Sequence, residues 1–532
     1  MALTIRKATA ADVPGWIALL KATLDADYPD KQAYDPALIA SQLQEGADVE
    51  TWVADTGTQL QSALTFLPPL SANNNPVANI GRHLNRPEAF GDGSAMALLT
   101  KANEIARERQ QVLVSRVFAS DSALQRLYEQ AQFICVGFQP FKHMNKVREG
   151  TLFYFRFSVP DAVKRFPISE SLSQVSELAT LVLSKLNIPN PVSIRDGVTG
   201  YPLQTDLLIS EGTMDDFELW RMQAQGSNPP LEVSGLFNQG IGYLRLPGSP
   251  ASKVLLGQRE GKFVAGVALV FDELDRCVRI FDSFSQDDLS MGALFQQAMK
   301  LAQEQFNAVY VEVDILMTAP RLLKAVEQLG FVPIAYLPAI YSKDGSFADV
   351  VKLVKLNMVY SLENPSFTAS AKAVADVIDH NFQDQKVGVA IINLLRGLPF
   401  FEGLGDGELR KIARLFTQKL YRPGEKVFSK GDSGNEAYVV MRGQIDIVIE
   451  EGAKPLASIG NGQIFGELAF LDGTPRNAIA VANQATILLV IQRSAFNNLV
   501  QREPHLGMVV MKNIAIELSN RLRKTTAAVA RK

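Results

Sequence analysis

Hydrophobic and polar positions alternate in two rhythms over the first 360 residues. Apolar runs of strand length, such as VLVSRVF within 111–120, are followed by segments with helical apolar spacing, such as SALQRLYEQAQ at 122–132. A regular succession of strand, helix and strand is typical of α/β packing around a mixed sheet. We therefore predict α/β architecture for this part of the chain.

The same order of elements occurs twice. A hairpin is expected over 51–68 and another over 253–272, with turns at Asp55-Thr56-Gly57 and Glu260-Gly261. Each is followed by a helix, a strand, a helix and a strand. The interval from Ala95 to Phe133 is 38 residues, and that from Gly292 to Phe331 is 39. This favours a duplicated domain; two unrelated α/β domains with the same rhythm are the alternative.

Near residue 361 the pattern changes. A polar linker and a helix lead into a region with frequent glycines and short alternating apolar runs, such as EAYVVMRGQIDIVIEE, and the chain closes with a long helix. Short strands with dense turn signals predict a β-barrel or jelly roll. The expected domains are 1–148, 149–360 and 392–532, with a linker and helix over 361–391.

Composition limits the partners and the compartment. The chain has 532 residues, a net charge of −3 and a pI near 6.0, so charge alone gives no attraction to nucleic acid or anionic membranes. Two cysteines and four scattered histidines predict neither disulfides nor a metal site. We find no signal-peptide pattern and no run of about 18 apolar residues, as a membrane helix requires. A cytoplasmic protein without membrane or nucleic-acid partners is expected.

The stretch FGELAFLDGTPRNAIAVA at 465–482 contains a candidate ligand site. Gly466 allows backbone to approach a ligand closely, and Arg476 offers a forked donor suited to phosphate. Glu467, when ionised, only accepts hydrogen bonds and so suits a hydroxyl group. A ligand held between the two is a nucleotide whose phosphate lies beside its ribose.

This stretch resembles the phosphate-binding cassette of the cyclic nucleotide-binding domain, the family of the catabolite activator protein and the regulatory subunit of protein kinase A. The flanks at 398–416 and 421–448 are similar to the entry helices and first strands of that β-roll, and the likeness covers about 392–525. It implies that Glu467 accepts from the ribose 2′-hydroxyl and that Arg476 pairs with the cyclic phosphate. The implied site comprises Gly466, Glu467, Leu468, Arg476, Asn477 and Ala478.

One position departs from the family pattern. Where the family usually has Thr, Ser or Ala, this chain has Ile479. Without a threonine hydroxyl for guanine, the resemblance implies cAMP ahead of cGMP. A barrel that kept its shape but lost its nucleotide is the alternative. The closing helix is of a kind that often pairs in this family, which leaves a homodimer open.

The two N-terminal repeats resemble the GNAT acyltransferase fold. The likeness rests on five stretches, at 5–20, 51–65, 124–138, 257–270 and 326–337. In this family a glycine-rich loop that opens a helix holds the acyl-CoA pyrophosphate through backbone N–H groups. The resemblance places that loop at 90–95 in the first repeat, with Gly91, Gly93, Ser94 and Ala95 as cofactor-binding residues. In the second repeat it falls on Asp287 and Asp288, which repel phosphate, so that repeat is expected to be degenerate.

The resemblance also places a general-acid tyrosine on Tyr128, whereas the second repeat has Val326 there. Tyr128 is catalytic in one interpretation and a buried structural tyrosine in the other. The first functional hypothesis is a cyclic-nucleotide-regulated N-acetyltransferase that uses acetyl-CoA on a protein or small amine. The alternative is a non-catalytic signalling protein whose GNAT-like domains have lost CoA.

Overall fold

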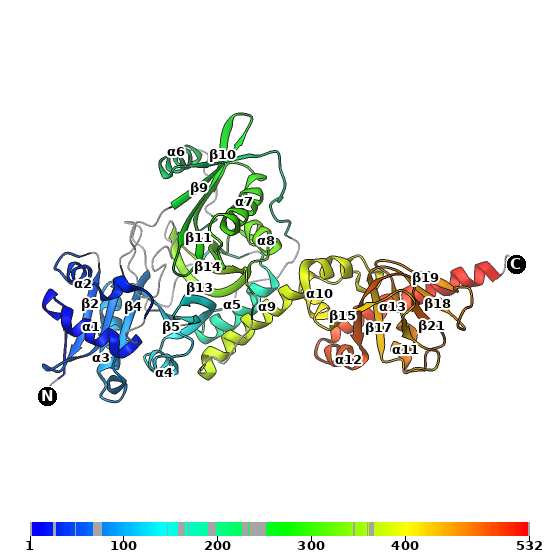
Figure 1. The fold of residues 1–532 in the computed structure, drawn as a ribbon, viewed down its shortest axis with the longest axis horizontal. Helices are drawn as coiled ribbons and strands as arrows, with labels where there is room; N and C mark the ends of the chain where they lie inside the picture. Colours follow the sequence, from blue (N-terminus) through cyan, green and yellow to red (C-terminus); the bar gives the residue numbers. More distant parts are fainter. Residues whose placement is uncertain are drawn as a thin grey trace. The chain divides into compact units, whose positions relative to one another are not determined.

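The computed structural model divides into two compact units, residues 1–382 and 383–532 (Figure 1). The structure describes residues 3–24, 28–47, 49–67, 77–145, 147–157, 165–168, 170–189, 198–225, 232–233, 252–343, 346–358, 360 and 366–529.

The first unit is built on a mixed sheet of fourteen strands. The strands are β1 (Thr4–Lys7), β2 (Glu50–Asp55), β3 (Leu60–Leu67), β4 (Val77–Asn85), β5 (Val112–Phe118), β6 (Ile134–Met144), β7 (Arg148–Arg156), β8 (Leu208–Gly212), β9 (Ser252–Arg259), β10 (Lys262–Asp272), β11 (Cys277–Ser285), β12 (Tyr310–Leu316), β13 (Val332–Lys343) and β14 (Ser346–Leu356). The predicted hairpins are confirmed as the pairs β2–β3 and β9–β10.

The strand order is β1-β2-β3-β4-β5-β7-β6 in the first half of this sheet and β13-β14-β12-β11-β10-β9-β8 in the second. Read outward from the junction, both halves follow one topology, and each contains one parallel pair, β4–β5 or β11–β12. They meet where Gly137 of β6 pairs with Ala335 of β13. Because β7 pairs with β5 and β6, the strand that follows the expected boundary at residue 148 lies in the first half of the sheet.

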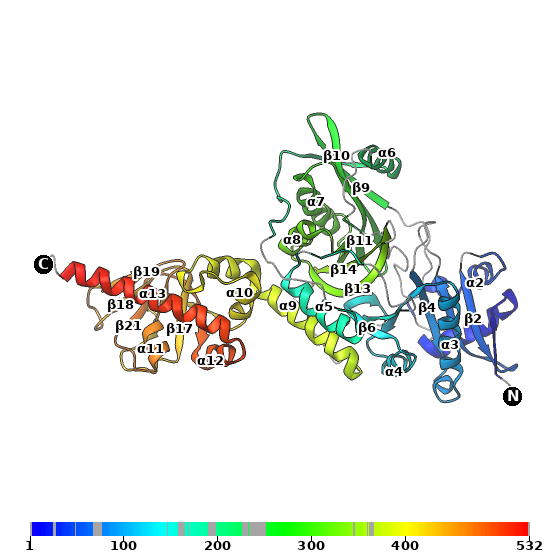
Figure 2. The ribbon, with the colours of Figure 1, turned by 180° about the vertical axis from the view of Figure 1, so that it is seen from behind.

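Helices pack on this sheet, and one hydrophobic core runs through both halves. Figure 2 shows α3 beside the strands of the first half, where it packs on β2 and β3. The helices are α1 (Val13–Leu24), α2 (Pro36–Gln42), α3 (Ser94–Glu108), α4 (Ser122–Gln130), α5 (Ser173–Lys185), α6 (Met214–Gln225), α7 (Ser290–Glu304), α8 (Pro320–Gln328) and α9 (Ala369–Arg396). The unit boundary falls within α9.

The second unit is a β-roll, as predicted, made of two antiparallel sheets with orders β15-β22-β17-β20 and β16-β21-β18-β19. The strands are β15 (Phe416–Tyr421), β16 (Lys426–Phe428), β17 (Glu436–Arg442), β18 (Ile445–Val448), β19 (Ala457–Ile459), β20 (Ile464–Phe465), β21 (Ile479–Ala482) and β22 (Thr486–Gln492). The helices are α10 (Asp406–Ala413), α11 (Glu467–Asp472), α12 (Arg493–Arg502) and α13 (Pro504–Val529). Apolar residues of α10, α12 and α13 share a core with the first sheet.

Two features are absent from the described residues. Within these ranges no helix combines the length and apolarity needed to cross a membrane. In the same ranges no three His, Cys, Asp or Glu side chains are grouped so that they could hold a metal ion.

Candidate functional sites

The candidate nucleotide site lies between β20 and β21, with the short helix α11 between them. β20 ends at Phe465, and Gly466 takes a left-handed conformation with φ of 75° before α11 starts at Glu467. A Cβ at residue 466 would lie 2.8 Å from Nη1 of Arg476. Glycine is therefore required here both by the backbone conformation and by the close approach of the arginine.

Arg476 is held inside the β-roll, with 4% of its surface exposed. Its Nη1 donates to the carbonyl of Gly466 at 2.8 Å, and its Nη2 donates to the carbonyl of Glu436. Its Nε is buried without a partner, and no carboxylate pairs with this guanidinium among the described residues. Burying an arginine with only carbonyl acceptors leaves its charge uncompensated, so an anionic oxygen would be a stronger partner.

Glu467, at the start of α11, is also buried, with 7% exposed. The other members of the cassette differ in environment: Leu468 and Asn477 are exposed, and Ala478 is half-buried. Ile479 is buried, begins β21 and pairs with Val448. The structure thus brings Gly466, Glu467 and Arg476 together inside the domain, whereas the side chains of Leu468 and Asn477 lie at its surface.

An apolar pocket connects the cassette with the helices of the second unit. Glu467 and Phe470 of the cassette line it, and so do Phe496 of α12 and Val510 and Ile514 of α13. A displacement of α11 would therefore change the packing of α13 directly.

In the first unit, the predicted cofactor loop lies at the start of α3. Gly93 has φ of 83°, and nothing lies within 4 Å of the position a Cβ would take there. The Asp92 carboxylate accepts from the backbone N–H of Ser94 at 2.8 Å, and the Ser94 hydroxyl is buried without a partner among the described residues. Gly91 is exposed, whereas Ala95 is buried. The loop is therefore open to approach on the side of Gly93.

The corresponding loop of the second half is occupied by the chain itself. The Asp287 carboxylate accepts from the backbone N–H groups of Leu289 and Ser290 at 2.9 and 2.8 Å and pairs with Arg259. A Cβ on Gly292 would lie 2.3 Å from the carbonyl oxygen of Pro202. Helix α7 thus begins against a carboxylate and a covering segment, an arrangement that disfavours a bound pyrophosphate.

Tyr128 is fully buried in α4. Its hydroxyl lies 2.8 Å from the Ser115 hydroxyl, and its ring packs against Phe133 and Tyr154. Burial raises the pKa of Tyr128 well above its usual value near 10. This environment suits a structural tyrosine, and its catalytic role remains a prediction.

Sequence reasoning did not find His83 or a basic pocket between β4 and β5. Both ring nitrogens of His83 are buried without partners in the described part of the chain, and burial lowers its pKa to about 3. The pocket is lined by Arg82, Arg116, Arg279 and Lys352, from four different strands. In a sequence, a polar or charged residue within an apolar strand is interpreted as facing solvent. The hydrophobic pattern therefore indicates neither the burial of His83 nor the pocket.

Comparison with known proteins identifies the second unit. Residues 418–503 match the family model described as cyclic nucleotide-binding domain. The C-terminal part of the chain is therefore a cyclic nucleotide-binding domain of the catabolite activator and protein kinase A regulatory type, as the cassette resemblance predicted.

The relatives cover this chain only in part. The cyclic AMP receptor protein of Thermus thermophilus is 34% identical over 133 residues, which are 24% of this chain and 60% of that protein. The cAMP-dependent protein kinase regulatory subunit of Schizosaccharomyces pombe is 28% identical over 153 residues, 29% of this chain and 35% of that protein. The crystal structure of Thermus thermophilus catabolite activator protein matches 25% of this chain and 62% of that chain, with 33% identity and a TM-score of 0.23.

Proposed function

We propose that this protein is a cyclic nucleotide sensor whose C-terminal domain binds cAMP. The observation that carries the proposal is the buried Arg476, which has carbonyl acceptors but no carboxylate partner among the described residues. A cyclic phosphate would supply the missing anion, and Glu467 would accept from the ribose 2′-hydroxyl. Two relatives of this domain are named for cyclic AMP, which supports the choice of base.

The pocket that joins the cassette to α13 supports a regulatory role. Nucleotide binding would shift α11, and because Glu467 and Ile514 line one cavity, α13 would repack in response. Regulation requires that cAMP bind one arrangement of these helices more tightly than the other. The domain would thus report nucleotide concentration to the rest of the chain.

Calorimetric titration of the full chain with cAMP tests this proposal. We expect saturable heat with one cAMP per chain. Arg476→Gln should weaken binding about 100-fold, because it removes two charge-assisted hydrogen bonds of roughly 1.5 kcal/mol each. Arg442→Gln, which changes an exposed arginine of β17, is the matched control and should bind as the wild type does. No heat from the wild type, or equal affinities in both variants, would disprove the proposal.

A second candidate function, acyl transfer in the first half of the first unit, is favoured by the strand geometry there. β4 and β5 pair only from Val77↔Val112 to Ile80↔Ser115 and then separate, β4 continuing beside β3 and β5 beside β7. The opening that this separation leaves between β4 and β5, together with the accessible Gly93, could accept a thioester cofactor. In this proposal backbone N–H groups at Gly91, Gly93, Ser94 and Ala95 hold acetyl-CoA. Those of Gly91 and Ser94, which donate to the Glu88 carbonyl and the Asp92 carboxylate in this structure, would exchange these acceptors for the pyrophosphate. The amine of a protein or small molecule then attacks the thioester and displaces the CoA thiol.

Acetyl-CoA binding to the full chain, followed by release of free thiol with and without cAMP, tests the second candidate. We expect binding to wild type and to Tyr128→Phe alike. If Tyr128 protonates the leaving thiolate, kcat should fall about 100-fold in that variant. An unchanged kcat would assign the tyrosine to the core. Failure of acetyl-CoA to bind would favour the non-catalytic signalling alternative and would leave the cAMP proposal intact.

A further inference from the structure

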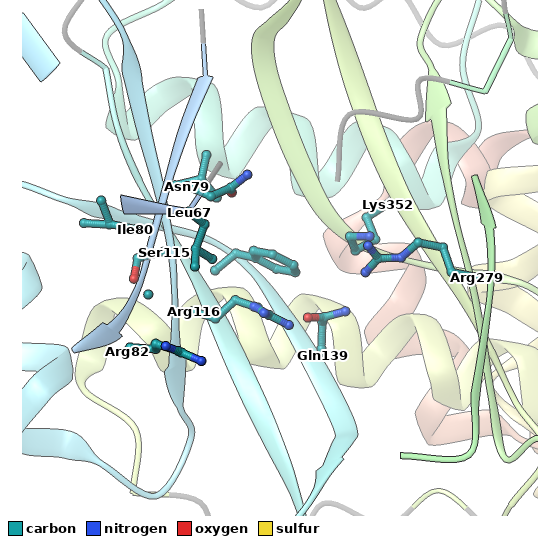
Figure 3. Close-up of a pocket in the computed structure, with 12 residues that line it drawn as sticks. Leu67, Asn79, Ile80, Arg82, Ser115, Arg116, Gln139, Arg279 and Lys352 are labelled. Atoms are coloured by element: carbon teal, nitrogen blue, oxygen red, sulfur yellow. The ribbon is translucent and has the colours of Figure 1, made fainter. Parts of the chain in front are cut away.

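The first unit contains a basic pocket at the point where β4 and β5 separate (Figure 3). Four of the twelve lining residues are cationic, and none of the twelve, all in the described part of the unit, is acidic. Arg82 and Arg116 come from β4 and β5, whereas Arg279 and Lys352 come from β11 and β14. Figure 3 shows these two groups of cations on opposite sides of the pocket, with the Gln139 amide between them.

Charged side chains are buried together beneath the pocket. Lys142, Arg279 and Lys352 are buried cations, and all three contact the Glu312 carboxylate. Asp314 pairs with Lys352 at 2.6 Å and is the second carboxylate of this group. The neighbouring Asp275 carboxylate does not line the pocket; it contacts His143 and also attracts Lys142.

The three buried cations therefore face three carboxylates. At the pocket itself Arg82, which Asp30 attracts, and Arg116 add positive charge. A pocket lined by four cations and by no acidic side chain among the described residues favours an anion over a neutral molecule. Burial lowers the pKa of Arg82 to about 10, as expected for a cation held away from water. The pocket is thus electrostatically suited to an anion.

Arg279 has a donor that no described residue accepts from. Its Nε and Nη2 contact Glu312, but its Nη1 is buried without a hydrogen-bond partner among the described residues. The side chain is 5% exposed and lines the pocket. Buried donors without partners are rare in folded proteins, and a ligand oxygen would satisfy this one.

The equivalent position in the second half is filled by the chain. β11 and β12 separate after Ile280↔Val313, as β4 and β5 do in the first half. There Val233 forms a bridge with Ile315, and the backbone N–H of Leu316 donates to the carbonyl of Glu232 at 2.9 Å. The two openings thus differ: the second contains protein backbone, whereas the first is lined by cations.

We propose that the first opening binds a small metabolite with two anionic oxygen groups. One group would lie at Arg279 and Lys352 and the other at Arg82 and Arg116. Gln139, whose amide donates to Glu312 at 3.0 Å, lies between the two pairs of cations (Figure 3). A dicarboxylate and a phosphorylated carboxylate both have this chemistry. The proposal does not depend on nucleotide binding by the second unit. It concerns the opening that the acyl-transfer candidate assigns to acetyl-CoA, so the two ligands would compete for it.

Titration of the full chain with succinate, 3-phosphoglycerate and acetate tests the proposal. At least one of the two dianions should bind at one site per chain and at least tenfold more tightly than acetate. Tighter binding of succinate would identify a dicarboxylate site, and tighter binding of 3-phosphoglycerate a phosphate-bearing ligand. Equal weak heats for all three anions would overturn the proposal.

Two variants and two controls locate the site. Arg279→Gln and Arg116→Gln should each weaken the tighter dianion at least tenfold. Arg221→Gln removes a partly exposed arginine that pairs with Asp282 outside the pocket and should have no effect. Arg476→Gln should also leave dianion binding unchanged, which separates this site from the nucleotide site. If Arg279→Gln does not fold, the test rests on Arg116→Gln, because Arg116 is only half-buried. Unchanged ligand binding in Arg116→Gln would overturn the assignment of the site.

Discussion

The Cζ atom of Arg476 lies 4.3 Å from the centroid of the Phe428 ring. The aromatic face supports the guanidinium from one side while the carbonyls of Gly466 and Glu436 fix its plane. Because such a contact contributes about 0.5 to 2 kcal/mol, Phe428→Leu should weaken cAMP binding about two- to thirtyfold. Calorimetry measures the change, and Phe428→Tyr, which keeps an aromatic face, should restore most of the affinity. Equal losses in both variants would exclude the ring contact as the cause.

Substitutions at Ile479 test whether the nucleotide site prefers adenine or guanine. The family resemblance attributes a guanine-preferring contact to a threonine hydroxyl that this chain lacks, and Ile479 is buried at the start of β21. A new hydrogen bond is worth roughly 0.5 to 1.5 kcal/mol, so Ile479→Thr should raise cGMP affinity relative to cAMP about two- to tenfold. The ratio of the two dissociation constants is the measurement. Ile479→Val has the shape of threonine without its hydroxyl, and the same shift in that variant would contradict the explanation.

Features encoded within short stretches could be predicted from the sequence. The cassette at 465–482 is contiguous, so its glycine, carboxylate and guanidinium could be identified from their spacing. The turn at Glu260-Gly261 could be predicted for the same reason, because its residues are adjacent in the sequence. In the structure both take positive φ where β9 meets β10. The β-roll followed from turn density and alternation, which are also local properties.

Features assembled from distant strands could not be predicted in this way. Arg82 and Lys352 are 270 positions apart in the sequence, yet they line one pocket because the two halves form a continuous sheet. That continuity depends on the pairing of Gly137 with Ala335, and nothing in the local pattern of either strand indicates its partner. The burial of Tyr128 has the same origin, since strands and helices distant in the sequence complete the core around it.

The junction between the two halves of the sheet gives a stability prediction. A Cβ on Gly137 would lie 2.2 Å from the Cβ of Ala335 and 2.6 Å from the carbonyl oxygen of Ile334. Backbone must move to relieve such contacts, so Gly137→Ala should destabilise the first unit by about 3 kcal/mol or more, at the upper end for overpacking. Gly91→Ala is the control, because the nearest atom to its new Cβ is 3.7 Å away.

Tryptophan fluorescence during urea denaturation measures this effect in the first unit. All three tryptophans of the chain, Trp16, Trp52 and Trp220, lie there, so the signal does not report on the cyclic nucleotide-binding domain. This matters because a chain with several domains need not unfold in a single transition. A Gly137→Ala midpoint equal to that of Gly91→Ala would show that the junction relaxes without cost.

Glu232 makes the stability of the first unit depend on pH. Its side chain is 7% exposed and accepts a hydrogen bond from the Tyr201 hydroxyl at 2.8 Å, and burial raises its pKa from 4.5 to about 7. The folded state therefore prefers the protonated acid. This contribution is fully present below about pH 4.5, decreases as the pH rises and is lost above about pH 7, a change of about 3 kcal/mol.

Replacing this carboxyl group should remove that pH dependence. Glu232→Gln keeps an acceptor for Tyr201 and cannot ionise, so it should match wild type near pH 4.5 and exceed its unfolding free energy by up to about 3 kcal/mol at pH 8. Tryptophan-detected urea denaturation at several pH values measures the difference. Glu304→Gln, at an exposed position of α7, should follow the wild-type profile throughout. If the unfolding free energies of Glu232→Gln and wild type differed by the same amount at every pH, the carboxyl group would stay ionised in the folded protein. A charged Glu232 would then be buried next to the bridge between Val233 and Ile315.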